Sequence, residues 1–547
     1  MAGMLSLPSL LSARVEAVAG IDPEMRPATR PQFGHFQTNV ALRLANTEGR
    51  PPREVAQRLV AAIDLSDLCE PLEVAGPGFI NLRIKADVLA SVASQVLADP
   101  RAGINLTDRP QTVVIDYSAP NVAKQMHVGH LRSTIIGDCF SRVLRATGNT
   151  VIPQNHIGDW GRQFGMLVEQ IIEDSTEVTA LDLAGAEELY KRANAHLKKS
   201  EGFADRARDR VVKLQAGDPE TLRIWRQLID ISLAGFNATY RRMNVLLSDA
   251  DLAGESTYNA DLPVVADDLA ERGIAVVDDG ALVVFVEGMP TPAIIRNQRG
   301  GYGYACSDLA AIRRRVGVLG ADRIIYVVGA PQTFHFEQVF AVARMAGYLP
   351  ASVSAEHVGF GQVLGKDGKK FSTREGTAVT LNSLLDAAEA EAAPSVALAA
   401  IKYADLSSGL QKDYVFDAER MVATTGDTGP YLQYAHARVS QILRKAEAHG
   451  HQITSVTVLS EPAEQTLALL LSRFGEVVDA VADTLQPHRL CGYLYEVAGA
   501  LSVFYEQCPV LKSSGQVRSS RLALCAATKK VLARGLDLLG IEAPERM

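Results

Sequence analysis

The sequence predicts an α/β fold, with a doubly wound parallel sheet in the middle of the chain, a smaller α+β domain before it and an all-α helical bundle after it. Three observations predict this class. Short apolar runs of the buried parallel-strand type alternate with helical patterns in the middle of the chain. Residues 1–108 mix helical and strand periodicities, and beyond about residue 390 the apolar spacing is wholly helical. We therefore expect three domains, at 1–108, 109–390 and 391–547.

The N-terminal unit combines a helical stretch at Val55–Ile63 with strand-like alternation at Phe79–Ile84. The turn-forming segment Gly76–Gly78 stands directly before that strand, where the chain must reverse. This mixture is typical of a small α+β domain.

The central unit opens with a strand, a helix and a second strand. Thr112–Asp116 is a short apolar run, Val128–Ala146 has helical periodicity and ends at Gly148, and Thr150–His156 is strand-like again. This βαβ order implies a parallel sheet.

A polar, charge-rich helical span at about 175–260 interrupts the alternation, and we expect an insertion at about 175–300. Strand-like runs resume at Ala281–Val286 and Arg323–Val328, and the second leads into a helical pattern near Phe336–Met345. Two separated halves predict a doubly wound sheet that binds its ligands at the carboxyl ends of its strands.

The C-terminal unit shows only helical periodicity. Apolar residues recur at helical spacing in 467–471, 494–504 and 522–539. A bundle of helices is the expected fold.

The composition indicates a globular protein. Of the 547 residues, 47% are hydrophobic and 22% are charged, which excludes a disordered or fibrous chain. The formal net charge of −8 does not by itself indicate a nucleic-acid partner, so any RNA-binding face must be a local basic patch.

Several features favour the cytoplasm. The six cysteines form no Cys-x-x-Cys pair and no regular spacing, which argues against a disulfide framework or a zinc site. Pro8, Arg14 and Glu16 interrupt the N-terminus, which does not resemble a signal peptide. No run approaches the roughly 18 apolar residues of a membrane span. We expect a cytoplasmic protein with no membrane partner.

Two segments carry residues that suit a nucleotide. The first is His127–His130, at the expected turn between strand and helix, where a helix N-terminus presents free N–H groups to phosphate. Gly129 lets a flat base approach the backbone, and the two imidazoles can hydrogen-bond phosphate oxygens. Taken alone, these four residues are better explained as a surface histidine pair or as two metal ligands.

The second segment is Gly365–Arg374, which includes Lys370 and Ser372. Two glycines and four cations could close over a polyphosphate, although alone they indicate only a solvated loop. The spacing is not that of a P-loop, and Gly359–Gly361 is followed by Leu364 instead of the third glycine of a dinucleotide fingerprint.

Together the two segments resemble the HIGH and KMSKS motifs of class I aminoacyl-tRNA synthetases, and longer runs resemble the arginyl-tRNA synthetases of bacterial type. These runs are Asp116–His130, Asn155–Phe164, Phe33–Asn39, Gly76–Asn81, Thr428–Arg438 and Pro544–Met547. The resemblance reaches almost the whole chain. It implies a class I Rossmann-type catalytic domain, an N-terminal domain that contacts the D-loop of tRNA and a C-terminal anticodon-binding domain.

The resemblance also implies an arginine pocket, formed by Asp116, Asn121, Tyr304, Asp308 and Gln332. A guanidinium is planar, always charged and has five donors, so it requires carboxylates and neutral acceptors at fixed angles. Such a pocket rejects lysine, ornithine and citrulline because its own groups would be left unpaired. In isolation, Asp308 would be a surface or capping acid and Tyr304 a core aromatic.

The implied chemistry has two steps, in which the carboxylate of L-arginine attacks the α-phosphate of ATP and the terminal ribose of tRNA-Arg then takes the arginyl group. The residues expected at ATP are His127, Gly129, His130, Lys124, Lys370 and Ser372, with Mg²⁺ on the phosphates and no metal held by side chains. Thr373 stands where the KMSKS pattern has its second lysine, and we expect Lys124 to supply that cation. A monomer is expected.

Aromatic side chains beside cations are the signal for reading single-stranded RNA bases. The resemblance implies anticodon contacts at Tyr431, Tyr434, Arg438, Tyr505 and Met547, and D-loop contacts at Phe79 and Asn81. For each aromatic alone, core packing is the more common explanation. His35 departs from the family pattern, which has an acidic residue there.

Three rival interpretations are weaker. Another class I synthetase would not need this set of carboxylates and amides. A nucleotidylyltransferase shares His-x-Gly-His but is a single small domain. A non-enzymatic tRNA-binding scaffold should have lost His127, His130 or the loop cations, and all of them are present.

Overall fold

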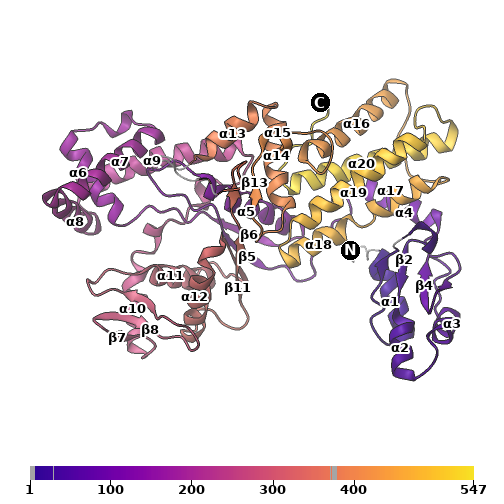
Figure 1. Cartoon of the computed structure of the whole chain (residues 1–547), viewed down its shortest axis with the longest axis horizontal. Coiled ribbons are helices and arrows are strands. Elements are labelled where there is room, and N and C mark those ends of the chain that lie inside the picture. Colours follow the sequence, from indigo (N-terminus) through magenta and orange to yellow (C-terminus); the bar gives the residue numbers. More distant parts are fainter. Residues whose placement is uncertain (1–6, 29, 370, 372–378) are drawn as a thin grey trace.

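The computed structural model of the protein describes residues 7–28, 30–369, 371 and 379–547. The molecule is elongated, with the N-terminal sheet at one end, the helices of the insertion at the other, and the parallel sheet and C-terminal helices between them (Figure 1). Among the described residues, no helix combines the length and the apolar character that crossing a bilayer requires.

The N-terminal part is an antiparallel sheet of order β1-β2-β4-β3, packed against helices α2 and α3. The elements are α1 (Leu7–Ala19), β1 (Arg26–Pro27), β2 (Phe36–Thr38), α2 (Val40–Glu48), α3 (Pro52–Ala62), β3 (Glu73–Ala75) and β4 (Phe79–Leu82). The expected strand and helix of this unit are confirmed as β4 and α3. The next helix, α4 (Ala86–Ala98), lies away from the sheet and packs against the C-terminal helices α17 and α20.

The central sheet is parallel throughout, with the order β11-β10-β5-β6. Its elements are β5 (Thr112–Asp116), α5 (Val128–Ala146), β6 (Thr150–Gln154), α11 (Tyr304–Gly317), β10 (Arg323–Gly329), α12 (Thr333–Met345) and β11 (Ser354–Phe360). Val113 and Ile115 face one hydrophobic core and Val114 faces another, because helices cover both sides of the sheet. The βαβ unit is therefore confirmed.

The expectation that Ala281–Val286 belongs to the parallel sheet is wrong. Ala281–Val284 forms β8 in a separate antiparallel sheet, between β7 (Val276–Asp278) and β9 (Ala293–Arg296). The tight turn at Asp279 and Gly280, both with positive φ, folds β8 back on β7, and that reversal forces antiparallel pairing. An apolar run identifies a buried strand but not its partner.

The insertion begins with four helices after β6, namely α6 (Arg162–Asp174), α7 (Leu183–Lys199), α8 (Glu201–Gln215) and α9 (Pro219–Arg242). Each of the last three helices starts at a capping residue whose side chain accepts a hydrogen bond from a backbone N–H of the first turn. The capping residues are Asp182, Ser200 and Asp218 respectively. A further helix, α10 (Asp261–Glu271), follows and packs against α11.

The C-terminal part is helical. Its elements are α13 (Leu381–Glu389), α14 (Pro394–Ser407), α15 (Ala418–Met421), α16 (Gly429–Ala448), α17 (Pro462–Leu471), α18 (Phe474–Thr484), α19 (His488–Gln507) and α20 (Gly515–Leu538), with the short parallel pair β12 (Val363–Leu364) and β13 (Tyr414–Val415). Helices α13, α14, α18 and α20 all pack against α5, so the C-terminal helices rest directly on the central domain.

Candidate active site

The start of α5 is organised by two histidines that cap it. The N–H of Gly129 donates to Nδ1 of His127 at 3.0 Å, and the N–H of His127 donates to Nδ1 of His130 at 3.1 Å. A ring nitrogen that accepts a hydrogen bond carries no proton, so in the neutral rings the proton is on Nε2. Both histidines therefore have an Nε2–H left to donate to a ligand.

Burial keeps these histidines neutral. It lowers the pKa of His130 to about 3 and also lowers the pKa of His127, and the neighbouring Lys124 cation acts in the same direction on both. Gly129 is required beside them, because a Cβ at this position would stand 2.7 Å from the ring of His127.

A cleft of about 540 Å³ opens in front of the start of α5. One wall holds Asn121, Lys124, His127 and His130, so the structure brings these predicted residues together. The opposite wall is α7, which was not predicted as part of a site; it contributes Glu187, Tyr190, Lys191, Asn194, Lys198 and Lys199. Lys370 and Ser372 lie outside the described residues.

Two contacts tie α7 to the segment before α5. Lys124 Nζ lies 4.1 Å from the centre of the Tyr190 ring, a cation–π distance. Gln125 Nε2 donates to Glu187 Oε2 at 2.9 Å. The position of Lys124 in the cleft therefore depends on α7.

An acidic group of side chains lies where α11 and the segment before α10 approach the sheet. Asp308 on α11 contacts His335 Nε2 through Oδ2 at 2.6 Å. Burial, together with the charges of Asp159 and Asp308, raises the pKa of Glu255 to about 7. Among the described residues, the Glu255 carboxylate has no hydrogen-bond or ion-pair partner. Sequence reasoning missed Glu255, and only its burial beside other acids identifies it.

Asp116 is already paired with a cation of the protein itself. Arg315 of α11 is completely buried and donates to Asp116 Oδ2 at 2.6 Å and to Gln154 Oε1 at 2.6 Å. Its guanidinium also lies 4.9 Å from the centre of the Tyr326 ring. Sequence reasoning missed Arg315, which is 199 residues from Asp116 in the chain.

The side chains of Tyr304 and Gln332 are both exposed to solvent. Tyr304 begins α11, one turn before Asp308, and is 77% exposed, while the exposed Gln332 caps the start of α12. Among the described residues, neither side chain has a hydrogen-bond partner. The structure thus places Tyr304 one helical turn before Asp308 and Gln332 three residues before His335, without fixing either side chain.

A second candidate surface lies on α16. A cavity of about 580 Å³ is lined by Tyr434, Arg438, Gln441, Arg444, Lys445, Arg546 and Met547. The Arg438 guanidinium lies 3.8 Å from the centre of the Tyr505 ring. Four of the five residues expected at the anticodon therefore gather here. Tyr431 does not line this cavity, and its ring packs 5.6 Å from that of Tyr495.

The residues expected at the D-loop lie on β4. Asn81 is buried, and its Oδ1 accepts a hydrogen bond from Gln37 Nε2 at 2.7 Å, while Phe79 is half-buried. The N–H of Ile84 donates to His35 Nδ1 at 3.0 Å, and burial lowers the pKa of His35 to about 4. A neutral His35 can thus serve as the acceptor that an acidic residue would provide.

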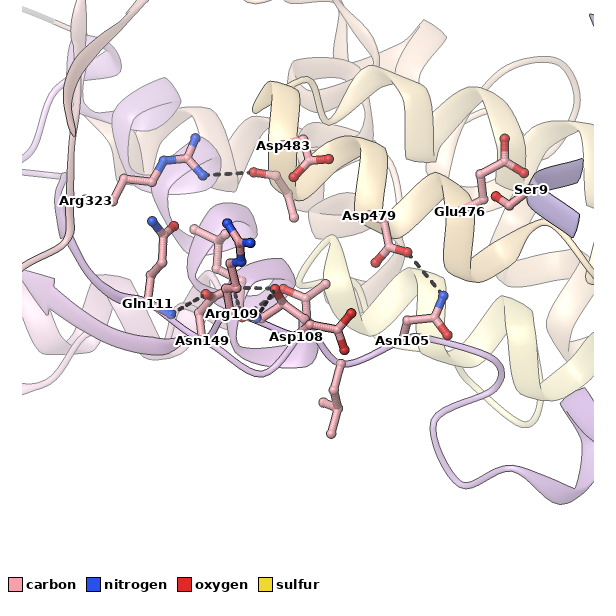
Figure 2. A pocket seen from close by; sticks show the side chains of 15 residues that line it. Ser9, Asn105, Asp108, Arg109, Gln111, Asn149, Arg323, Glu476, Asp479 and Asp483 are labelled. Carbon is pink, nitrogen blue, oxygen red and sulfur yellow. Dashed lines mark hydrogen bonds between the residues drawn. The ribbon is translucent and has the colours of Figure 1, made fainter. Parts of the chain in front are cut away.

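A third cavity lies at the edge of the central sheet where its strands begin. It is lined by Gln111, Asn149 and Arg323, which stand at the amino ends of β5, β6 and β10, and by acidic side chains of α18 (Figure 2). Asn105 Nδ2 donates to Asp479 Oδ2 at 3.3 Å across it. Because parallel sheets place ligands at the carboxyl ends of their strands, this cavity is separate from the candidate site.

Family models match three stretches of the chain. Residues 92–394 match the catalytic domain of "tRNA synthetases class I (R)", residues 432–547 match the "DALR anticodon binding domain", and residues 7–84 match the "Arginyl tRNA synthetase N terminal domain".

Similar proteins agree with these matches. The chain is 67% identical to an arginine–tRNA ligase of Cutibacterium acnes, over 100% of both chains, and 50% identical to one of Thermobifida fusca, over 98% of this chain and 99% of that one. Among solved structures, it is similar to the arginyl-tRNA synthetase of Plasmodium falciparum, with a TM-score of 0.85 and 26% identity over 100% of both chains. The arginyl-tRNA synthetase of Thermus thermophilus matches with a TM-score of 0.82 and 25% identity, over 99% of this chain and 100% of that one.

Proposed function

This chain belongs to the arginyl-tRNA synthetases of class I, and from that premise we propose which of its residues carry out each step of the activity. The protein is an arginine–tRNA ligase, whose substrates are arginine, ATP and tRNA. In the first step, a carboxylate oxygen of arginine bonds to the α-phosphorus of ATP and pyrophosphate leaves. In the second step, a ribose hydroxyl at the end of tRNA takes the arginyl group and AMP leaves.

We propose that His127, His130 and Lys124 stabilise the phosphates as charge shifts toward pyrophosphate. The observation that carries this assignment is the pair of cap hydrogen bonds, which leave both Nε2–H groups free at the positive end of α5. Donors fixed in advance lose little free energy in reorganisation during the reaction. Lys370 and Ser372 are proposed to complete this set from the loop.

Mg²⁺ is proposed to arrive on the phosphates of ATP. Among the described residues, no three His, Cys, Asp or Glu side chains are grouped so that they could hold a metal ion. Mg²⁺ typically keeps most of its ligands from phosphates and water, which matches a cleft lined by donors.

We propose that the arginine guanidinium binds Asp308 and Glu255, with Tyr304 and Gln332 closing over it. Glu255 supports this assignment because a half-buried carboxylate without a partner is costly unless a cation arrives. Asp116 and Asn121 would then bind the end of the substrate that carries the ammonium group. Asp116 would use its Oδ1 for this, since its Oδ2 is occupied by Arg315.

We further propose that α7 guides the 3′ end of tRNA into the cleft. Tyr190 offers an aromatic face for a base, and Lys191, Lys198 and Lys199 offer cations for phosphates. This assigns a role to the insertion at about 175–300. Lys198→Met should raise KM for tRNA and leave pyrophosphate exchange at saturating tRNA unchanged, whereas an unchanged KM would remove α7 from the tRNA path.

The cavity on α16 is proposed to bind the anticodon, and β4 with Phe79 and Asn81 to face the D-loop. Tyr434→Ala should weaken tRNA binding by roughly 1–3 kcal/mol, the typical value of one stacked base. Tyr431→Ala is the matched control, because Tyr431 packs against Tyr495 instead of lining the cavity. Equal effects of the two substitutions on tRNA affinity would contradict the assignment.

We also propose the domain boundaries, the cellular location and the oligomeric state. We place the domain boundaries near residues 108 and 390, the protein in the cytoplasm, and its active form as a monomer, since one chain supplies every residue of the proposed sites. The decisive assay is ATP–pyrophosphate exchange with each amino acid, with and without tRNA. Exchange with arginine alone among them would support the assigned pocket, and equal exchange with lysine would contradict it.

A further inference from the structure

Helix α5, which carries His127 and His130 at its start, is held along its length by buried charges of the C-terminal domain. Arg132 Nε lies 3.3 Å from Asp405 Oδ2, and Lys402 Nζ lies 3.8 Å from Asp138 Oδ2. Lys402 and Asp405 are three residues apart on α14 and therefore face α5 together. All four side chains are at most 1% exposed.

Lys402 joins four separate elements. Its Nζ donates to the carbonyl oxygen of Gly540, just after α20, at 3.0 Å and to that of Asn244, just after α9, at 3.2 Å. Asn244 Nδ2 also donates to the Gly540 carbonyl at 3.0 Å. On α5, Arg142 donates to Asp138 Oδ2 at 2.8 Å and to the Asn244 carbonyl at 2.9 Å.

From this junction, residues 540–547, the terminal segment, run along α16 to the cavity proposed for the anticodon. Gln433 Nε2 donates to the Glu542 carbonyl at 2.9 Å, and His436 Nδ1 donates to the Pro544 carbonyl at 2.9 Å. Near the end of the segment, Arg444 donates to the Glu545 carbonyl at 2.7 Å. Beyond these contacts, Arg546 and Met547 line the cavity.

Two of the α16 side chains that bind the segment each keep one buried atom unsatisfied. Gln433 Oε1 and His436 Nε2 have no hydrogen-bond partner among the described residues. A buried polar atom without a partner is unfavourable, so a rearrangement of the segment that satisfies Gln433 Oε1 and His436 Nε2 would gain free energy. The segment thus connects the Lys402 junction to the cavity through successive hydrogen bonds to Lys402, Gln433, His436 and Arg444.

The buried charges at the Lys402 junction can fix the position of α5 relative to α14 and Gly540. Buried ion pairs contribute little net stability compared with apolar packing, but they specify one register between the elements they join. Apolar helices could slide past each other, whereas Lys402 makes its hydrogen bonds only in one relative placement of α5, α14 and Gly540.

We infer that Lys402 is a positioning residue, which, through the terminal segment, couples occupancy of the cavity on α16 to the placement of α5 and hence of His127 and His130. The inference rests on the proposed binding of the anticodon in that cavity. It predicts that the anticodon affects turnover as well as affinity, and that the effect on turnover requires Lys402.

The test compares a tRNA-Arg transcript with the same transcript substituted in its anticodon, each at saturating concentration. In the wild-type enzyme, the substitution should lower kcat by a factor within about 5–150, the usual range of coupling between sites. In Lys402→Met, kcat with the native transcript should already be low, and the ratio of the two kcat values should fall to within about twofold. The dissociation constant of the native transcript should stay unchanged.

A second variant avoids the buried core. Glu545 is 57% exposed and pairs with Lys529 at 2.6 Å and with Arg444, which lines the cavity, at 3.4 Å. Glu545→Gln loosens the terminal segment by removing the charge that pairs with Lys529, while the stronger bond from Arg444 to the Glu545 carbonyl at 2.7 Å remains. It should lower the ratio of kcat values to between those of wild type and Lys402→Met. Glu542→Gln is the matched control, because the exposed Glu542 side chain has no partner among the described residues, and it should keep the wild-type ratio. If Lys402→Met fails to fold, Glu545→Gln carries the test.

The outcomes distinguish a failure of the role inferred for Lys402 from a failure of the anticodon assignment. A wild-type ratio in both Lys402→Met and Glu545→Gln overturns the inference. It is also overturned if the substituted transcript binds more weakly to the wild-type enzyme but turns over with the same kcat, although the anticodon assignment then stands. If the two transcripts bind the wild-type enzyme equally well, the anticodon assignment itself fails.

Discussion

The two halves of the proposed active site, a donor half for ATP and an acidic half for arginine, solve opposite electrostatic problems. On the α5 side, Lys124, His127 and His130 present donors that we propose bind phosphates, and burial lowers the pKa of both histidines so that they stay neutral there. On the α11 side, Asp308 and Glu255 present carboxylates, and burial raises the pKa of Glu255 to about 7. Burial therefore disfavours the charged forms of the two histidines and of Glu255, and we propose that a ligand of the complementary kind completes each half.

The largest effect is expected in the donor half, from Lys124→Met. One preorganised charge contact is worth about 2.7–4 kcal/mol, so pyrophosphate exchange should slow by roughly 10²–10³. Arginine and tRNA affinities should stay close to those of wild type, because Lys124 faces the phosphates. Adding Thr373→Lys should restore part of the rate, and a single variant within a few-fold of wild type would remove Lys124 from the site.

The next effect is expected in the acidic half, from Asp308→Asn. Loss of one charged hydrogen bond costs about 1.5–3 kcal/mol, so kcat/KM for arginine should fall by roughly 10–150-fold while KM for ATP hardly changes. Asp267→Asn, which alters an exposed acid on α10, is the matched control. If the loss falls on ATP instead of arginine, the division of the proposed site into a donor half and an acidic half is wrong.

The sequence predicted the donor half better than the acidic half, for a physical reason. His127, Gly129 and His130 act within one helix turn, so a local motif contains their geometry, and β5, α5 and β6 follow from local periodicity. Glu255 acquires its character only through burial beside residues far away in the chain, and the Asp116–Arg315 pair joins two elements that no local pattern connects.

The same limit explains the errors in the fold. The run that became β8 was identified as a strand, but its sheet was assigned wrongly, because a strand's partner is set by the turn and by packing. The wall formed by α7 was missed because its lysines lie in a helix whose polar face looked merely solvated. Residues that act through local geometry could be predicted, and residues that act through tertiary contacts could not.

A smaller effect with two signs is expected from Glu255→Gln. The folded pKa of Glu255 lies above its unfolded value near 4.5, so its charge destabilises the empty enzyme as pH rises from about 4.5 through 7. The variant should bind arginine more weakly, yet unfold at a higher temperature at pH 8 when no ligand is present. Thermal denaturation with and without arginine measures both, and a lower melting temperature of the empty variant would contradict the account.

The smallest effect concerns the histidines. Because the folded pKa of His130, about 3, lies below the unfolded value of 6.5, the unfolded state binds protons first as pH falls. Stability is therefore full above pH 6.5 and decreases below it, by less than about 1.4 kcal/mol between pH 7 and 6 for this group. His130→Asn keeps an acceptor for the His127 N–H and should flatten this decline in thermal melts. An unchanged pH dependence would show that His130 is protonated in the folded enzyme.

We propose that Asp308 and Glu255 form an acidic receptor for a guanidinium. Measuring proton release during arginine binding tests this claim most directly. Because its pKa is raised to about 7, the Glu255 carboxyl is partly protonated at pH 7, and an arriving guanidinium lowers that pKa, so binding must release protons. Calorimetric titrations of arginine in two buffers with different ionisation enthalpies should show proton release on arginine binding in the wild-type enzyme and none in Glu255→Gln. Arginine binding without proton release, or with the same release in Glu255→Gln, would contradict the account.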